Sequence, residues 1–391
     1  MSGRTGPGPG PPLAHVPTLD GWRAVAIILV LLSHGGDGIL RLFVAAPFDS
    51  THYAFLKDPI GRGGVHLFFA LSGYLITTRL LAEEYRRGSV SLSGFYVRRF
   101  FRIQPAALTF LLTVAVLGSL GTIPISPTGW WSALFAFANF TLPAQTWYTV
   151  HFWSLAVEEH FYLIWPLLFV LLAPRHRLGL SIMLALAAAC WSALVLQTHF
   201  TQTPYMWIRT DIEAPWLLWG CIAALALRSR TAAEHIARFA HPGTCLAAVL
   251  ALAVASATLI YSPLDWRMDL VVTLFAAAAT PLLFVATSRH AGSWLGRVLE
   301  LAPVAWLGRI SYGVYLWQQL FFVWDNDRAP RLDPWQSFPW QIVATLAIAA
   351  LSYYTLEQPL LRVGHRLARR ATEHPLGRIR SYLPELHLPR W

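Results

Sequence analysis

Charged residues are scarce in this chain, and lysine is almost missing. Asp, Glu, Lys and Arg make up 13% of the 391 residues, while 55% are hydrophobic. Soluble domains carry about 25% charged residues, so a soluble globular fold is excluded. Lys57 is the one lysine, and the other basic residues are arginines clustered between apolar segments. The formal net charge of +10 therefore indicates positive membrane loops rather than a nucleic-acid partner.

Paired cysteines, a cleavable signal and repeats are missing as well. Cys190, Cys221 and Cys245 show no CxxC spacing, so the sequence predicts neither a disulfide framework nor a bound metal. The opening MSGRTGPGPGPP lacks the apolar core of a signal peptide and is rich in proline and glycine. We therefore expect residues 1–17 to form a flexible cytoplasmic tail. No internal repeat is visible, and no stretch is long enough for a soluble domain.

Long apolar runs dominate the remaining sequence and predict an all-α, polytopic membrane protein of ten transmembrane helices. A spanning helix needs about 20 mostly apolar residues. The runs that reach or approach this length lie at 20–37, 64–82, 106–122, 152–173, 179–198, 213–228, 243–261, 270–287, 304–324 and 336–356. A shorter run lies at 130–142.

The arginine clusters decide the topology. They lie at 86–102, 175–177, 228–238, 289–309 and 362–380. If the 130–142 run does not cross, every cluster falls on the cytoplasmic side, as the positive-inside rule requires. We therefore predict a plasma-membrane protein with both termini cytoplasmic and a re-entrant or half-helix at 130–142. The membrane domain covers 18–361, and the basic tail 362–391 is expected to lie on the anionic inner leaflet.

The first apolar run carries ionisable residues at both ends. Arg23 and His34 are eleven residues apart, which is about three turns and 16 Å, so their side chains share one helix face. Charged groups inside a membrane usually face a polar cavity and mark a functional site. The alternative is that Arg23 only snorkels to the inner interface, close to Asp20, while His34 caps the outer helix end.

An arginine cluster precedes the third run, in FYVRRFFRIQPA at 95–106. Arg99 and Arg102 are three residues apart, so on a helix they point the same way and suit phosphate oxygens. Arg98 and its neighbours are equally well explained by positive-inside anchoring, and the interleaved aromatic residues suit an amphipathic in-plane helix.

Two further runs carry polar groups. Glu158 and Glu159 interrupt an otherwise apolar helix, and because adjacent residues are about 100° apart they must face different surroundings. A structural polar knot between helices is the alternative interpretation. The second run, GRGGVHLFFALSGYLITTR, carries His66, Ser72, Tyr74 and Arg79, and its glycines favour close helix packing over a phosphate loop.

These stretches, in this order, resemble the acyltransferase family 3 of integral membrane O-acyltransferases. The resemblance covers about residues 18 to 365. The motifs that carry it are LDGWRAVAIILVLLSH, GGVHLFFALSGYLITTRLL, FYVRRFFRIQPA, FWSLAVEEHFYLIWPLLF, GRISYGVYLWQQLFF and SYYTLEQPLLR. Trp22, His66 and His160 depart from the residues common in the family, which we expect to change the cavity but not the reaction.

The resemblance implies transfer of an acyl group, usually acetyl, from acyl-CoA to a hydroxyl of a glycan, a glycolipid or a macrolide. Arg23, Arg99 and Arg102 are then expected to hold the CoA phosphates, without any metal. His34 is expected to be the general base, oriented by Glu158 or Glu159. No esterase domain follows the membrane domain in this sequence, so we expect the acceptors of single-domain sugar and macrolide acylases.

A proton-coupled transporter or flippase is the alternative function, because an Arg/His/Glu chain in a membrane also suits proton-coupled transport. The absence of inverted repeats and the arginines on the inner side favour the enzyme. A sensor without turnover leaves the His/Glu residues unexplained.

Overall fold

The computed structural model describes residues 15–35, 50–199, 208–260, 266–323, 329–373 and 378–380, and it confirms a helical protein. The one sheet in these ranges is a ribbon in which β1 (Ser89–Ser91) pairs antiparallel with β2 (Arg378–Arg380). The longer helices are α1 (Pro17–His34), α3 (Ser50–Arg87), α4 (Leu92–Ser119), α7 (Phe152–Leu171), α8 (Pro174–His199), α9 (Thr210–Ala226), α11 (Pro242–Ile260), α12 (Trp266–Arg289), α14 (Ala302–Phe321), α15 (Trp340–Ser352) and α16 (Gln358–Glu373).

Each of the ten predicted spans coincides with helix over most of its length. Within the described ranges, five helices are long and apolar enough to cross a membrane, and a sixth span results if the bent pair α9 and α10 (Arg230–Phe239) counts as one. The multi-pass helical character is thus confirmed, whereas the count of ten crossings is not. The loops and tails at 1–14, 36–49, 200–207, 261–265, 324–328, 374–377 and 381–391 lie outside the described residues.

The short apolar run at 130–142 does not form a long helix. It contains the end of α5 (Pro127–Leu134), whose eight residues rise only about 12 Å, against a hydrocarbon core of about 30 Å. After α5 the chain makes the 3₁₀ turns Ala138–Phe140 and Leu142–Ala144, and then the short helix α6 (Trp147–Val150). Ala136, at φ 59°, ends the regular helix. This run therefore holds one short helix followed by turns, and its expected role as a re-entrant or half-helix stays a prediction.

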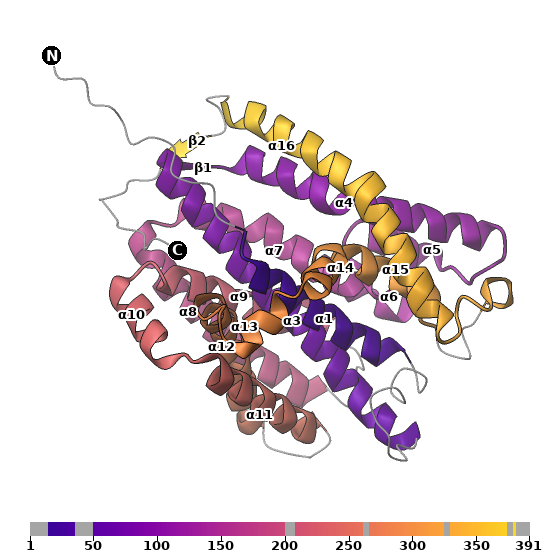
Figure 1. The fold of residues 1–391 in the computed structure, drawn as a ribbon, viewed down its shortest axis with the longest axis horizontal. Coiled ribbons are helices and arrows are strands. Elements are labelled where there is room, and N and C mark those ends of the chain that lie inside the picture. Colours follow the sequence, from indigo (N-terminus) through magenta and orange to yellow (C-terminus); the bar gives the residue numbers. More distant parts are fainter. Residues whose placement is uncertain are drawn as a thin grey trace.

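Helix α1 lies between α3 and α14 and brings them together (Figure 1). Its beginning lies against Gly308 of α14, where an added Cβ would come within 1.8 Å of the Asp20 carbonyl oxygen. Its end lies beside Gly61 of α3. Only glycine allows the backbones of α1 and α14 to approach this closely. Both ends of α1 therefore have fixed neighbours, Gly308 of α14 at its beginning and Gly61 of α3 at its end.

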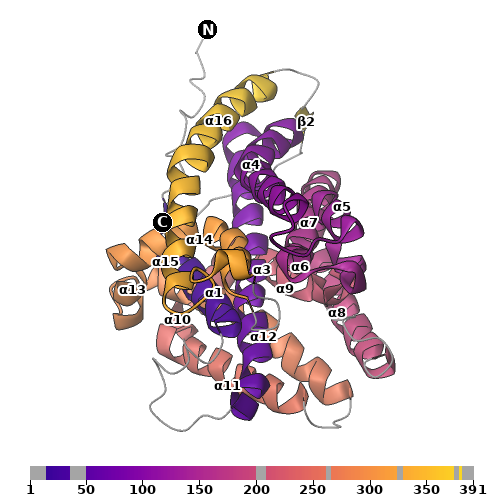
Figure 2. The same cartoon turned by 90° about the vertical axis from the view of Figure 1, so that its right-hand side faces the viewer.

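Helix α16 and the first half of α4 form an arm that projects from the bundle (Figure 2). Gly364 faces Phe101, and Gly94 faces Thr372. The predicted tail at 362–391 therefore begins within a packed helix. Away from this arm, the short helix α13 (Trp294–Leu299) connects α12 to α14.

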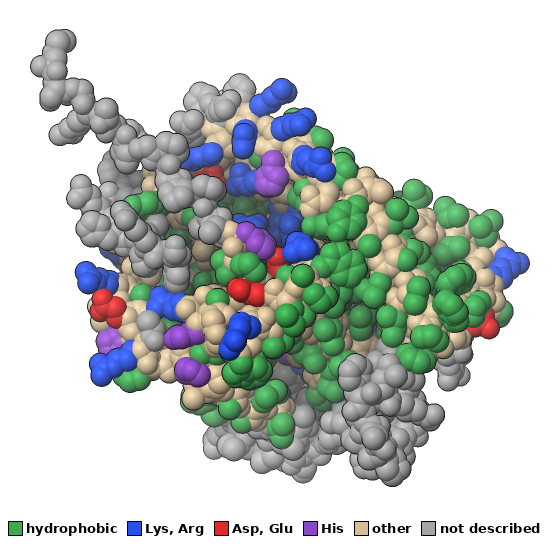
Figure 3. Space-filling view, viewed as in Figure 1, with side chains coloured by type: hydrophobic (Ala, Val, Ile, Leu, Met, Phe, Trp, Pro, Cys, Tyr) green, Lys and Arg blue, Asp and Glu red, His purple; other side chains and the backbone are tan. Residues whose placement is uncertain are grey.

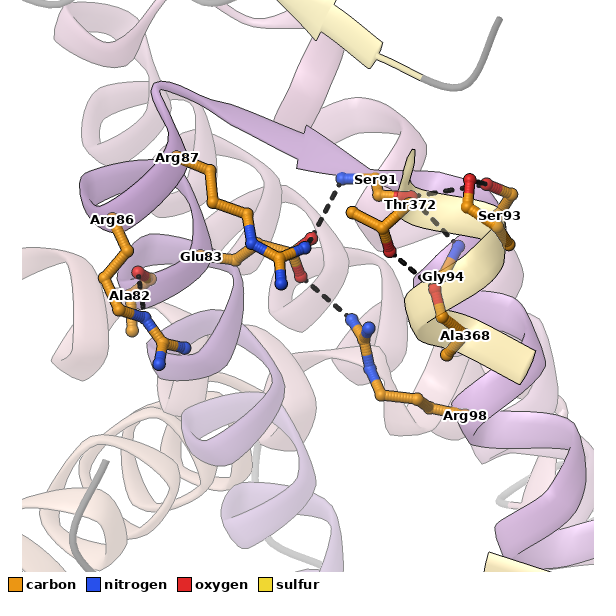
Figure 4. Close-up of polar contacts among 11 residues, drawn as sticks. Ala82, Glu83, Arg86, Arg87, Ser91, Ser93, Gly94, Arg98, Ala368 and Thr372 are labelled. Carbon is orange, nitrogen blue, oxygen red and sulfur yellow. Dashed lines mark hydrogen bonds and ion pairs between the residues drawn. The ribbon is translucent and has the colours of Figure 1, made fainter. Parts of the chain in front are cut away.

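A carboxylate fixes the arm to the end of α3. Glu83 accepts hydrogen bonds from the Arg98 guanidinium at 2.8 Å and from the Ser91 backbone N–H at 3.2 Å (Figure 4). Arg87 lies 3.6 Å from the same carboxylate. The Ser91 hydroxyl caps α4 by accepting from the Gly94 N–H. These bonds set the start of α4, and they engage Arg98 with Glu83.

A second ion pair is fully buried where α3 meets α8. Arg177 donates to both oxygens of Glu84, at 2.8 and 3.0 Å, and to the Leu172 carbonyl at 3.1 Å. Its guanidinium lies 3.8 Å from the centre of the Phe169 ring. The exposed fractions are 1% for Arg177 and 2% for Glu84. Removing one partner would leave the other charge buried without compensation, which is strongly destabilising.

We predict that Glu84→Ala lowers the free energy of unfolding by about 3–5 kcal/mol. Thermal unfolding in detergent measures the loss. The matched control is Glu234→Ala, which breaks the exposed Arg230–Glu234 pair and should change the stability little, because solvent screens surface ion pairs. Equal effects of the two variants would contradict a structural role for the buried pair.

Candidate active site

A large cavity opens among α1, α3, α4, α7, α14 and the junction of α15 with α16. Its empty space is about 1020 Å³, part of which is open solvent at the mouth. Apolar residues of α3, including Phe68 and Phe69, form part of its wall. The polar side chains that line it are Arg23, Ser72, Arg79, Arg99, Arg102, Ser154, Glu158, Tyr162, Arg309, Ser311, Tyr312, Tyr315, Tyr353 and Glu357.

Five of these side chains are arginines, contributed by four different helices. Arg23 is paired with Asp20 at 2.7 Å. The Arg99 guanidinium lies 3.4 Å from the centre of the Tyr162 ring, and its buried Nε has no hydrogen-bond partner. On the face drawn in Figure 3, arginine side chains are visible in a hollow and over α16, while hydrophobic side chains cover most of the end formed by α5 and α15.

Positive charge exceeds negative charge on the cavity wall. Against the five arginines stand two carboxylates, Glu158 and Glu357. Within the described residues, Arg79, Arg102 and Arg309 make no ion pair shorter than 4 Å. Unpaired guanidinium groups beside a cavity are suited to a ligand with several phosphates, because each presents a planar fork of donors.

A cluster of hydroxyl and carboxylate side chains lines the cavity. The Ser72 hydroxyl donates to Glu158 Oε1 and lies 3.0 Å from the Tyr162 hydroxyl. Glu159 points elsewhere, since Gln104 donates to it at 3.5 Å and both line a smaller cavity beside α5. The two adjacent glutamates therefore face different surroundings, as their spacing predicts.

His34 lies at the other end of α1, in a separate polar cluster. Its Nδ1 is 2.9 Å from Gln318 Oε1 of α14, and its ring meets the Trp147 ring edge to face at 5.3 Å. His151 follows α6, is 2% exposed, and neither of its ring nitrogens has a hydrogen-bond partner. His34 is not a lining residue of the large cavity, but Tyr315, one turn before Gln318, is.

The structure brings together Arg23, Arg99 and Arg102, the three residues expected to hold phosphates. It does not place Glu158 or Glu159 beside His34. The reason is the position of Glu158 along α7. His151, which belongs to the His34 cluster, lies just before α7, and Glu158 follows it by seven residues, about 10 Å further along the helix axis. Glu158 reaches Ser72, and an amide from α14 takes the place beside His34.

Sequence reasoning did not assign Arg79, Arg309 and Gln318 to the site. Arg79 follows Ser72 by seven residues, which puts the two on one face of α3, so helical spacing was a usable signal. Arg309 and Gln318 belong to GRISYGVYLWQQLFF, and the sequence indicates for them only the family resemblance and, for Arg309, a place in the basic cluster 289–309. Their neighbours lie on α1, α4 and α7, and helix spacing alone does not show such contacts.

Other polar groups lie away from the large cavity. His66 approaches Glu213 of α9 at 2.9 Å and stacks on Trp216 with ring centres 3.9 Å apart. The three cysteines are unpaired. In the described part of the chain, no group of three or more His, Cys, Asp or Glu side chains could hold a metal ion.

Comparison with known proteins finds a family match and several relatives. Residues 16–357 match the acyltransferase domain family. The peptidoglycan O-acetyltransferase OatA of Listeria monocytogenes is 31% identical over 382 residues, covering 90% of this chain and 56% of that protein. The O-acetyltransferase OatA of Staphylococcus aureus is 26% identical over 377 residues, covering 90% of this chain and 58% of that protein. YrhL of Bacillus subtilis is 29% identical over 388 residues, covering 92% of this chain and 57% of that protein.

The chain therefore spans less than two thirds of the length of each of these relatives. No solved structure matches it.

We predict that inorganic pyrophosphate stabilises the wild-type protein, because the cavity that gathers the arginines exists in the folded state alone. A ligand at 100 times its Kd adds about 2.7 kcal/mol to the free energy of unfolding. Thermal unfolding with increasing pyrophosphate measures the effect. Arg102→Gln should reduce it strongly, whereas Arg98→Gln, outside the cavity and paired with Glu83, should not. Equal stabilisation of both variants would contradict this assignment.

Proposed function

The chain belongs to the acyltransferase domain family, and from that membership we propose that it is a membrane O-acetyltransferase. The donor is acetyl-CoA, and the acceptor is a hydroxyl group of a glycan, a glycolipid or a macrolide. The observation that carries the proposal is the arginine-lined cavity, whose wall includes Arg23 of α1 and also Tyr315 of α14, one turn before the Gln318 that contacts His34.

The donor is proposed to enter from the cytoplasmic side. Arg23, Arg99 and Arg102, together with Arg79, would bind its phosphates, while its thioester arm extends toward Tyr315. The distance from Arg23 to His34 along the helix is about 16 Å. Such binding fixes the thioester in position without taking part in bond making. The cavity wall supports this orientation, because it also carries apolar and aromatic side chains, among them Phe68, Phe69 and Tyr315.

His34 is proposed as the general base. Its imidazole takes the proton of the acceptor hydroxyl while the oxygen forms a bond to the thioester carbonyl carbon. The carbon–sulfur bond then breaks, and the imidazolium returns the proton to the leaving sulfur, which gives the ester and free CoA. Glu158 and Glu159 remain candidate catalytic residues, and Glu158 is the one that lines the large cavity.

The proposal also includes the topology: the chain crosses the plasma membrane ten times, and both termini lie in the cytoplasm. Helices α1, α9, α11, α14 and α15 would then cross in addition to the more clearly apolar spans. The basic arm of α4 and α16 would lie on the cytoplasmic leaflet, where arginine side chains are favoured.

The names of the relatives make peptidoglycan the first acceptor to test. Other glycans, glycolipids and macrolides belong in the same panel, because they also carry hydroxyl groups that can accept an acetyl group. The transporter alternative finds no support among these relatives, which are named as O-acetyltransferases.

We predict that His34→Ala reduces acceptor-dependent release of CoA from acetyl-CoA by about 10²–10⁴-fold, because the general base is lost. Thiol release by detergent-purified protein measures the rate, and binding of CoA should be retained. His235→Ala, at an exposed site on α10, is the matched control and should keep wild-type activity. If His34→Ala keeps its activity, His34 is not the base.

We predict that Arg99→Gln raises the KM for acetyl-CoA about 10- to 100-fold with a smaller change in kcat. The loss corresponds to a hydrogen bond to a charged group, about 1.5–3 kcal/mol. Initial rates at varied acetyl-CoA measure both constants. Arg98→Gln should leave the donor KM unchanged, because Arg98 is engaged with Glu83. An unchanged KM in Arg99→Gln would refute the phosphate role.

A further inference from the structure

Two consecutive glutamines of α14 connect His34 to the backbone of α6. Gln318 and Gln319 are both 0% exposed. Gln319 Nε2 donates to the Trp147 carbonyl at 2.6 Å, and Gln318 Nε2 donates to Gln319 Oε1 at 2.8 Å. Gln318 Oε1 then lies 2.9 Å from His34 Nδ1. Buried amides in contact make a continuous chain of hydrogen bonds from a main-chain carbonyl to the imidazole.

The direction of these hydrogen bonds is fixed by groups that can only accept a hydrogen bond. A backbone carbonyl has no proton to give, so the Trp147 carbonyl requires the NH₂ of Gln319 to face it. The oxygen of Gln319 then faces Gln318. The Tyr315 carbonyl independently requires an NH₂ from Gln318, which donates to it at 3.4 Å. Both constraints leave the oxygen of Gln318 facing His34.

An amide oxygen accepts only, so the ring nitrogen that faces it must carry a proton. In a neutral imidazole one nitrogen is a donor and the other is an acceptor. We propose that Gln318 and Gln319 form a hydrogen-bond relay of fixed direction, which holds His34 with its proton on Nδ1 and its lone pair on Nε2. Nε2 is then the atom that takes the proton of the acceptor hydroxyl. This inference rests on the proposed function of His34.

Helix α6 positions the imidazole twice. The Trp147 side chain meets the His34 ring at an interplanar angle of 72°, which restricts ring rotation. The Trp147 carbonyl ends the relay that sets the tautomer. Gln318 is thus a positioning residue, in the place where the sequence led us to expect a carboxylate. Partners of this kind orient a histidine in the same way that outer-shell groups orient metal-bound histidines, and losing one typically costs 10–100-fold in activity.

Two substitutions of Gln318 separate positioning from packing. Gln318→Met has similar length but removes the oxygen that accepts from Nδ1–H, whereas Gln318→Glu keeps an oxygen there. The relay predicts that kcat falls about 10–100-fold in Gln318→Met, with an unchanged acetyl-CoA KM, and falls less in Gln318→Glu. A packing role predicts the opposite order, because a buried carboxyl is costly and methionine fills the space. That opposite order would overturn the proposal.

Gln336→Met is the matched control. Gln336 is also 0% exposed; it accepts from the Ala329 N–H and donates to the Leu320 carbonyl and, at 3.4 Å, to the Tyr148 hydroxyl, without a hydrogen bond to Gln318, Gln319 or His34. This variant loses a buried amide outside the relay, so it should lose stability but keep the kcat of the folded protein. A comparable loss of kcat in Gln336→Met would show that any buried amide matters and would overturn the relay.

A spectroscopic measurement on the wild-type protein covers the case in which Gln318→Glu does not fold. Nitrogen-15 NMR of histidine-labelled protein, with the His34 signals assigned by comparison with His34→Asn, distinguishes the tautomers. The proposal predicts a protonated Nδ1 and an unprotonated Nε2. A protonated Nε2 with an unprotonated Nδ1 would overturn it. The predicted tautomer in a protein without transferase activity would refute the proposed function and leave the relay standing.

Discussion

The arrangement of this protein depends on holding several arginines around one cavity inside an apolar bundle. Like charges repel strongly where the dielectric constant is low, and desolvation adds to that cost. The structure offsets part of the cost with Asp20 beside Arg23 and with the carboxylates of Glu158 and Glu357 on the cavity wall. The guanidinium groups that still face the cavity without a carboxylate partner remain available to a phosphate ligand. Such a ligand would relieve the repulsion, so binding and stability are coupled.

The parallel packing of α1 and α14 connects the two ends of the site. Gly308 lets the backbones touch near Asp20, and Gln318 meets His34 near the other end. Between these points α14 contributes Arg309, Tyr312 and Tyr315 to the cavity wall. A displacement of α14 would therefore change the arginine end and the histidine end together. This geometry is consistent with a donor that is held at one end and reacts at the other.

Much of the fold follows from local sequence, and much of the site does not. Apolar runs place the helices, and the short 130–142 run correctly indicates a segment too short to cross. Helical spacing brings Arg99 and Arg102 to one cavity and separates Glu158 from Glu159. The partner of His34 depends instead on the depth at which α7 and α14 pass α1. For α14, the contact of Gly308 with Asp20 helps to set that depth, and residue spacing along one helix does not reveal such a contact between distant segments.

The central claim is that the arginine cavity holds the donor with its reactive end toward His34. A cryo-electron microscopy structure with coenzyme A bound tests it most directly. The account predicts phosphate density within hydrogen-bond distance of Arg99 and Arg102, and the thiol on the side of Tyr315 and Gln318. Coenzyme A bound away from these arginines, or with its thiol directed to the arm of α4 and α16, would contradict it.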